Sequence, residues 1–187
     1  MNLPNITLVS FGHFEKELLE TTVEAVKREF RFPVIIREGH LDLGEFYDPT
    51  RRQYNGNSLL KIVDALPFTD SVKTLGLFNV DLFIPILTFI FGQAFLGGHT
   101  GIASLYRFNN ERYGMTGDNQ FLVDRFKKEA IHELGHTFGL IHCHEPTCVM
   151  RSSTYVEDID QKYEHFCIEC RRELDLKSIR QFGNLTI

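Results

Sequence analysis

The chain has 187 residues, a formal net charge of −5, 43% hydrophobic residues and 24% charged residues. This length favours one domain with a sizeable core, and the composition excludes disordered and collagen-like classes. Nucleic acid is not favoured as a partner, because the basic residues are scattered in short pairs and a phosphate backbone requires a clustered cationic face.

The N-terminal segment lacks the basic region of a secretory signal and soon becomes rich in charge, which indicates a cytoplasmic protein. Residues 82–106 contain no Asp, Glu, Lys or Arg and are long enough to span a bilayer. Pro85, Gln93, His99 and several glycines interrupt this stretch, which is typical of buried strands joined by tight turns. We therefore expect no membrane partner.

The first third of the chain predicts alternating strands and helices. Strands are expected at 5–11 and 33–36, because both runs are short and rich in β-branched residues. Residues 14–30 place apolar side chains at helical spacing, and residues 39–56 are expected to form a loop. A second helix should follow, capped by Asn57 and stopped soon after Leu66 by Pro67.

The remainder of the chain predicts two strand-rich segments, a loop, a long helix and a final amphipathic helix. In order, these elements span residues 72–82, 85–106, 109–118, 119–138 and 169–182. Some strands should be antiparallel, because glycine-containing turns join them. The long helix should be capped by Asp118 or Asn119 and ended by Gly139 in the left-handed conformation. The expected fold class is α/β (α+β), a twisted mixed sheet with packed helices.

The strongest chemical signal is HELGHTFGLIH at residues 132–142, an HExxHxxGxxH pattern. A helix turns by about 100° per residue, so His132 and His136 lie about 40° apart on consecutive turns and can bind one metal ion. Glu133 lies beside them, where its carboxylate can reach a metal-bound water and take its proton. The pattern therefore predicts a catalytic metal site.

The third histidine depends on Gly139. In a continued helix His142 would lie about 240° around the axis from His136 and would face away from the metal. A reversal at Gly139 can return His142 to the same ion. Three neutral imidazoles leave a fourth position for water, whose pKa falls to about 7 on zinc. HExxH alone recurs by chance, but the added glycine and histidine make coincidence a poor explanation.

Four cysteines form a second cluster in the sequence, Cys143 with Cys148 and Cys167 with Cys170. An even set could form two disulfides in a secreted chain. A four-cysteine zinc site is favoured, because a CxxC motif accompanies a second spaced pair and the export signal is missing. Cys143 follows His142 directly, so in an extended segment the two side chains point to opposite sides and serve different metals. We expect two Zn²⁺ ions per chain.

The run HExxHxxGxxHC, followed by Cys148, Met150 and CxxC, resembles the archaemetzincin family of metzincin-clan zinc peptidases. The matching positions cover residues 132–170. The resemblance implies a catalytic zinc on the three histidines, Glu133 as general base and acid, and a structural zinc on the four cysteines. It also implies that Met150 is the Met-turn residue, a hydrophobic floor under the imidazoles, whereas the sequence alone would make it a core methionine.

Other candidates are weaker. Tyr155 is either a surface residue or a group that approaches a substrate oxyanion. Residues 91–104 are either a buried hairpin or an edge strand that holds an extended peptide. Glu145 and Asp160 are expected to be solvated. Surface or satisfied core positions are expected for His13, His99, His144 and His165.

These observations predict one domain over residues 1–187. Residues 1–142 would form the sheet and the active-site helix, and residues 143–187 would form the Met-turn, the four-cysteine site and the C-terminal helix. The expected function is zinc-dependent hydrolysis of short or unfolded peptides by a monomer. The alternatives are a non-hydrolytic zinc protein whose four-cysteine module is an interaction surface, and a zinc hydrolase of non-peptide amides. Glu133 argues against the first, because metal binding alone does not need that carboxylate.

Overall fold

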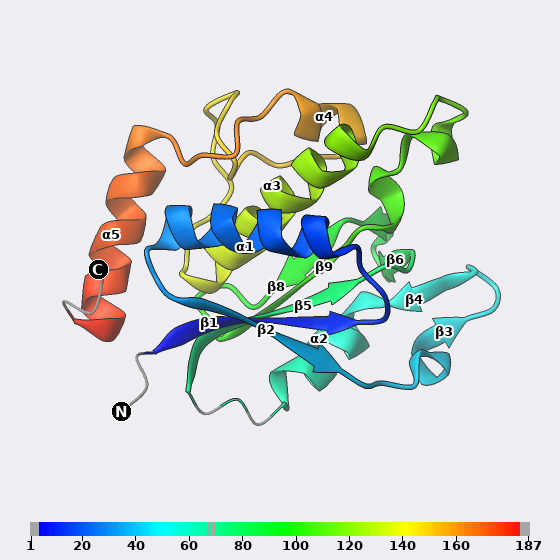
Figure 1. The fold of residues 1–187 in the computed structure, drawn as a ribbon, viewed down its shortest axis with the longest axis horizontal. Coiled ribbons are helices and arrows are strands. Elements are labelled where there is room, and N and C mark those ends of the chain that lie inside the picture. The colour runs from blue at the N-terminus through cyan, green and yellow to red at the C-terminus, as the bar shows by residue number, and fades with distance from the viewer. Residues whose placement is uncertain (1–3, 67, 69, 184–187) are drawn as a thin grey trace.

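The computed structural model describes residues 4–66, 68 and 70–183 (Figure 1). Its main element is a five-stranded sheet with the order β2-β1-β5-β9-β8. The strands β2, β1, β5 and β9 are parallel, and β8 pairs antiparallel with β9 at the edge. In sheet order, the strands span Val34–Gly39, Asn5–Phe11, Ser71–Phe78, Thr100–Ser104 and Gly92–Ala94. The predicted mixed sheet is confirmed.

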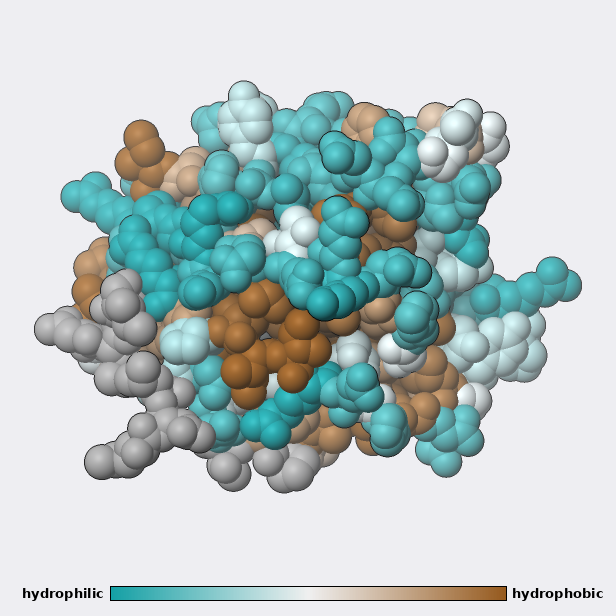
Figure 2. Space-filling view, viewed as in Figure 1, coloured by the Kyte–Doolittle hydropathy of each residue, from teal (hydrophilic) through white to brown (hydrophobic). Residues whose placement is uncertain are grey.

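Helices cover both faces of this sheet. Helices α1 (Lys16–Phe30) and α3 (Asn119–Thr137) lie on one face, and α2 (Gly56–Asp64) lies on the other (Figure 1). Alternate residues of β1 point to opposite faces, so Ile6 packs with the α1 and α3 core and Val9 with the α2 core. This double cover explains why β1 is buried along its whole length. Figure 2 shows the outer side of α1 as mostly hydrophilic, as an amphipathic helix requires.

The uncharged stretch at residues 82–106 forms strands, as predicted. It contains β6 (Leu82–Ile84) and β7 (Leu87–Ile90) in addition to β8 and β9. The first two strands belong to a smaller sheet with the order β3-β4-β6-β7. Within the described part of the chain, no helix is long and apolar enough to cross a membrane.

The prediction of a loop over residues 39–56 is wrong in part. This segment contains a 3₁₀ turn at Leu43–Phe46 and two short strands, β3 (Tyr47–Asp48) and β4 (Gln53–Asn55). The cap of α2 is also displaced, because the side chain of Asn55 accepts the hydrogen bond from the Ser58 backbone at 3.1 Å. Asn57 lies inside the helix and instead accepts a hydrogen bond from Gln93. The predicted stop at Pro67 lies outside the described residues.

The long helix agrees closely with its prediction. Asp118 caps α3 by accepting hydrogen bonds from the backbone of residues 120 and 121, and Gly139 follows the helix with a φ of +93°. The final helix, α5 (Ile168–Phe182), is also confirmed. A short helix, α4 (Val156–Asp160), was not predicted. Asp160 is not simply solvated, because it accepts two hydrogen bonds from Arg125, at 2.6 and 2.7 Å.

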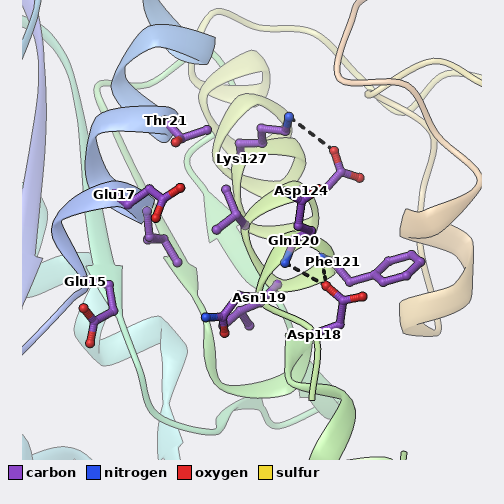
Figure 3. Close-up of a pocket in the computed structure, with 12 residues that line it drawn as sticks. Glu15, Glu17, Thr21, Asp118, Asn119, Gln120, Phe121, Asp124 and Lys127 are labelled. Atoms are coloured by element: carbon purple, nitrogen blue, oxygen red, sulfur yellow. Dashed lines mark hydrogen bonds and ion pairs between the residues drawn. The ribbon is translucent and has the colours of Figure 1, made fainter. Parts of the chain in front are cut away.

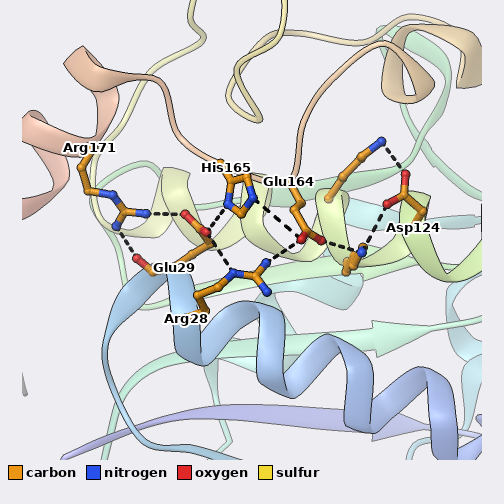
Figure 4. Close-up of polar contacts among 8 residues, drawn as sticks. Arg28, Glu29, Asp124, Glu164, His165 and Arg171 are labelled. Atoms are coloured by element: carbon orange, nitrogen blue, oxygen red, sulfur yellow. Dashed lines mark hydrogen bonds and ion pairs between the residues drawn. The ribbon is translucent and has the colours of Figure 1, made fainter.

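A cluster of charged side chains joins the C-terminal segment to α1 (Figure 4). Glu29, in the last turn of α1, is 2% exposed and pairs with Arg171 of α5. Its carboxylate also lies 2.6 Å from Nδ1 of His165. Glu164 connects Arg28 of α1 to α3 through Lys127, at 2.8 and 2.5 Å. Because these partners are distant in sequence, the C-terminal segment is positioned by tertiary ion pairs.

Replacing Arg125 by methionine should lower the free energy of unfolding by about 3 kcal/mol, because it leaves the carboxylate of Asp160 without its buried partner. The guanidinium also donates to the Phe108 carbonyl, which loses a partner as well. Urea denaturation would measure the change, with the exposed Arg172→Met as the matched control. A loss equal to that of the control would contradict the proposed stabilising role.

Candidate active site

Three histidines converge beside the end of α3. The helix carries His132 and His136 on one face, and their Nε2 atoms lie 3.1 Å apart. After the helix ends, the positive φ of Gly139 reverses the chain and brings His142 back to the other two. One ring nitrogen from each histidine lies within 4.8 Å of the others. The three side chains therefore offer three nitrogen ligands to a single ion.

Backbone carbonyls orient two of these rings. Nδ1 of His132 lies 2.8 Å from the Val149 oxygen, and Nδ1 of His136 lies 2.7 Å from the Leu140 oxygen. A carbonyl only accepts, so both Nδ1 atoms carry the proton and leave Nε2 free for a metal. Burial lowers the pKa of His132, His136 and His142 below the ordinary imidazole value. The rings are therefore neutral at pH 7, as metal binding requires.

Glu133 lies next to this cluster and is 5% exposed. Its Oε2 atom is buried and has no hydrogen-bond partner within the described part of the chain. Burial raises the pKa of this carboxyl well above its ordinary value, the negative charge of Glu129 raises it further, and the charge of Lys162 lowers it. Together with His132 and His142, Glu133 lines a cavity of about 330 Å³. The carboxyl of Glu129 can share a hydrogen bond with Glu133 when one of the two is protonated. When both are ionised, a partner for the free oxygen must come from a molecule in the cavity.

Two glycines allow the close packing around these groups. A methyl group at Gly135 would overlap the sulfur of Met150, which is fully buried beneath the helix. A methyl group at Gly92, on β8, would overlap the side chain of Glu133 and the Ile102 carbonyl. The sequence analysis did not identify either glycine. A glycine inside the HExxH helix was the available signal, since it is unfavourable there without a packing reason.

The four cysteines also converge. Their sulfur atoms lie within 4.8 Å of one another, and those of Cys143 and Cys167 are 3.8 Å apart, well beyond a disulfide bond. Backbone amides donate to two of the sulfurs, that of Cys167 to Cys148 and that of Glu145 to Cys143. The arrangement is a single group of four sulfur ligands instead of two bonded pairs.

The two clusters share one backbone connection. Cys143 follows His142 directly, and its amide donates a 2.9 Å hydrogen bond to the carbonyl of Met150. This contact is part of a bridge between Cys143 and Arg151. The segment that carries the third histidine is therefore attached both to the sulfur cluster and to the residue beneath α3.

The remaining residues that the sequence analysis considered as possible site residues lie in different parts of the structure. Tyr155 is 65% exposed. Residues 91–104 contain β8, which lies at the edge of the main sheet and contributes Gly92 to the cavity that Glu133 lines. His99 lies 2.8 Å from the Ser71 carbonyl, whereas His144 and Glu145 are exposed. Two residues that the sequence analysis did not identify, Glu129 and Lys162, lie in the cavity beside Glu133.

A larger cavity of about 930 Å³ lies elsewhere, between the first turns of α1 and α3 (Figure 3). Its carboxylates come from Glu15, Glu17, Asp118 and Asp124, and Lys127 pairs with the last of these at 3.3 Å. Its described lining contains neither histidine nor cysteine. The smaller cavity beside the three histidines is therefore the candidate active site.

Residues 13–176 match the model of peptidase family M54. An archaemetzincin from Pyrococcus abyssi is 40% identical over 148 residues, which cover 77% of this chain and 79% of that protein. An archaemetzincin from Thermococcus kodakarensis is 33% identical over 176 residues, which cover 90% of this chain and 94% of that protein.

Solved structures agree with these sequence matches. The crystal structure of archaemetzincin from Methanopyrus kandleri superposes with a TM-score of 0.82 at 30% identity, over 92% of this chain and 94% of that chain. A zinc-dependent peptidase from Methanocorpusculum labreanum gives the same TM-score and identity, over 91% of this chain and 100% of that chain. The chain thus belongs to peptidase family M54, the archaemetzincins, and is a zinc metallopeptidase.

Proposed function

We propose that the protein hydrolyses peptide bonds in short or unfolded peptides, with Glu133 as the general base and then the general acid. One observation carries this proposal. Among the described residues, the buried Oε2 atom of Glu133 has no hydrogen-bond donor, and Glu133 lines the same cavity as two of the three converging histidines, His132 and His142. Metal binding alone does not need such a carboxylate, so the family membership and this atom together favour hydrolysis over a non-hydrolytic zinc protein.

The nitrogen ligands fit zinc, because Nε2 of His132 and of His136 is free of a proton and the three rings are neutral at pH 7. When bound, zinc acts as a Lewis acid toward the scissile carbonyl and lowers the pKa of water to about 7. Glu133 accepts the proton of the attacking water and later donates it to the leaving amine. Burial favours the first of these steps, because a carboxylate with a raised pKa is a stronger base.

The proposed substrate class follows from the limited access that a substrate has to Glu133. Glu133 is 5% exposed, and the cavity lies between the strand residues 87–92 and the segment 152–154. An extended peptide can enter between these two walls and pair with the edge strand β8, whereas a folded surface cannot bring a peptide bond to a buried carboxylate. This supports cleavage of short or unfolded chains.

We also propose a second, structural zinc on Cys143, Cys148, Cys167 and Cys170. Four sulfur ligands within 4.8 Å of one another support a closed site without a free position. Met150 is proposed as the Met-turn residue, because it is fully buried and packs against Gly135, one residue before His136.

Replacing Glu133 by glutamine should retain zinc in the histidine site and lower kcat on a peptide substrate by about 10²- to 10⁴-fold, the usual contribution of a general base. Metal analysis and steady-state kinetics would measure the two effects. The exposed Glu24→Gln on α1 is the matched control. Unchanged peptide cleavage by the Glu133 variant would contradict the mechanism.

The two proposed zinc ions should leave under different conditions. At pH 7.5 a chelator should remove the histidine-bound ion first, because its site has a free position and the sulfur site is closed. The pKa values of the three histidines are lowered, so protons compete with zinc only below the ordinary imidazole pKa of about 6.5. Occupancy of this site should therefore be constant between pH 7.5 and about 6.5 and then fall.

Metal analysis after dialysis at each pH would measure the occupancy of both sites. The His142→Ala variant should lose binding of the histidine-bound ion only. Release of both ions in a single step, or loss of the labile ion already above pH 7, would contradict this assignment.

Replacing Cys143 by serine should lower the melting temperature and weaken zinc binding at the histidine site by about 10- to 100-fold, as expected for a residue that orients a ligand. The reason is that Cys143 is bonded to His142, so that loss of its sulfur loosens the segment that carries the third histidine. Cys170→Ser is the matched control, because it removes a sulfur ligand from α5 and should affect stability alone. Equal zinc affinity in the Cys143 variant and the wild type would show that the sulfur cluster does not support the histidine site.

A further inference from the structure

Two oppositely charged side chains lie at the base of the active-site cavity. Glu129, one helical turn before Glu133, is 5% exposed, and Lys162, which follows α4, is 3% exposed. Both line the cavity that contains His132 and Glu133. Their charges shift the pKa of Glu133 in opposite directions, but neither residue has a contact with substrate in the roles proposed so far. Burying two charges is costly, so their presence in this cavity calls for a ligand or a structural partner.

Within the described residues the two charges are only partly satisfied, although the carboxyl of Glu129 lies close enough to that of Glu133 for a hydrogen bond when one of the two is protonated. The ammonium of Lys162 donates to the Val149 carbonyl at 3.4 Å, and an ammonium has three N–H groups. The charges of Lys162 and Glu129 shift each other's pKa, but among the described residues the two side chains do not form a direct ion pair. Ser153 adds a buried hydroxyl without a partner to the same lining. Donors and acceptors are therefore available to a molecule in the cavity.

The cavity combines these polar groups with apolar walls. Leu87, Phe89 and Phe91 also line it. Such a cavity suits a side chain that has an apolar stem and a polar end. Its polar end must then satisfy both a cation and an anion.

This requirement distinguishes between the kinds of substrate side chain that could occupy the cavity. A carboxylate would pair with Lys162 but would meet the negative charge of Glu129. An ammonium would pair with Glu129 but would meet the charge of Lys162. An aliphatic side chain would displace water and leave both charges without a partner. A carboxamide is neutral and offers an acceptor to Lys162 and a donor to Glu129.

We propose that Lys162 and Glu129 select a glutamine or asparagine residue next to the scissile bond, an inference that rests on the proposed peptidase function. Lys162 donates to the carboxamide oxygen, and Glu129 accepts a hydrogen bond from the carboxamide NH₂ group. The pair thereby determines specificity without taking part in the chemical step.

The first experiment is cleavage of a mixed peptide library by the zinc-loaded wild-type protein, with the cleavage sites identified by mass spectrometry. Glutamine or asparagine should be enriched at one of the two positions that flank the cleaved bond. Cleavage without this enrichment contradicts the present inference and leaves the proposed function intact. A zinc-loaded protein that neither cleaves nor binds any peptide contradicts both.

The second experiment measures binding instead of turnover. Dissociation constants would be determined for zinc-loaded Glu133→Gln protein with four peptides that differ only at the enriched position, which carries glutamine, glutamate, lysine or norleucine. The glutamine peptide should bind at least about tenfold more tightly than the others, because each competitor leaves a buried polar group unpaired.

Two variants made in the same Glu133→Gln background test the role of each member of the pair. Lys162→Met should shift the preference toward the lysine peptide, and Glu129→Gln should shift it toward the glutamate peptide. Lys61→Met, which removes an exposed lysine of α2, should leave the order unchanged. If one variant fails to fold, the other still tests the proposal. An unchanged order in a folded variant, or tightest binding of the norleucine peptide by the parent protein, would show that the pair has a structural role only.

Discussion

The active site depends on the backbone of one residue, Val149, which is buried beneath α3. Its carbonyl accepts hydrogen bonds from His132 at 2.8 Å and from Lys162 at 3.4 Å, and its amide donates to the His165 carbonyl. The flanking residues are Cys148, a sulfur ligand, and Met150, the residue beneath Gly135. One short segment thus orients a histidine, holds the cavity lysine and connects the two candidate metal sites.

The histidine cluster could be identified from the sequence because its geometry is local, whereas the four cysteines were identified by their spacing in two pairs. The helical period fixes the relation of His132 to His136, and a glycine at the end of the helix permits the return of His142. The same reasoning predicted Asp118 or Asn119 as the cap of α3, of which Asp118 is observed, and a strand at residues 5–11. Periodicity and capping were sufficient for these long or strongly patterned elements, but they missed the short helix α4 and the short strands β3 and β4.

The features that sequence analysis missed depend on distant neighbours. Arg125 determines the environment of Asp160 from 35 positions away, and Glu29 meets His165 across 136 positions. Lys162 lies in a charge-rich segment, and nothing local shows that its side chain reaches the cavity. Asn55 replaces Asn57 as the cap of α2 because the helix begins where β4 ends, a boundary set by sheet pairing. Tertiary contacts decided each of these cases.

The position of Val149 in the chain also sets an order of assembly. It lies 17 residues after His132, so α3 leaves the ribosome before the carbonyl that holds the first histidine in its ligand tautomer. The segment around Glu164 and α5, which anchors this region to α1, is synthesised later still. The contacts that orient the histidines are therefore complete only once residue 149 has been synthesised. A chain that ends before residue 149 lacks both the carbonyl that orients His132 and the sulfurs of Cys167 and Cys170.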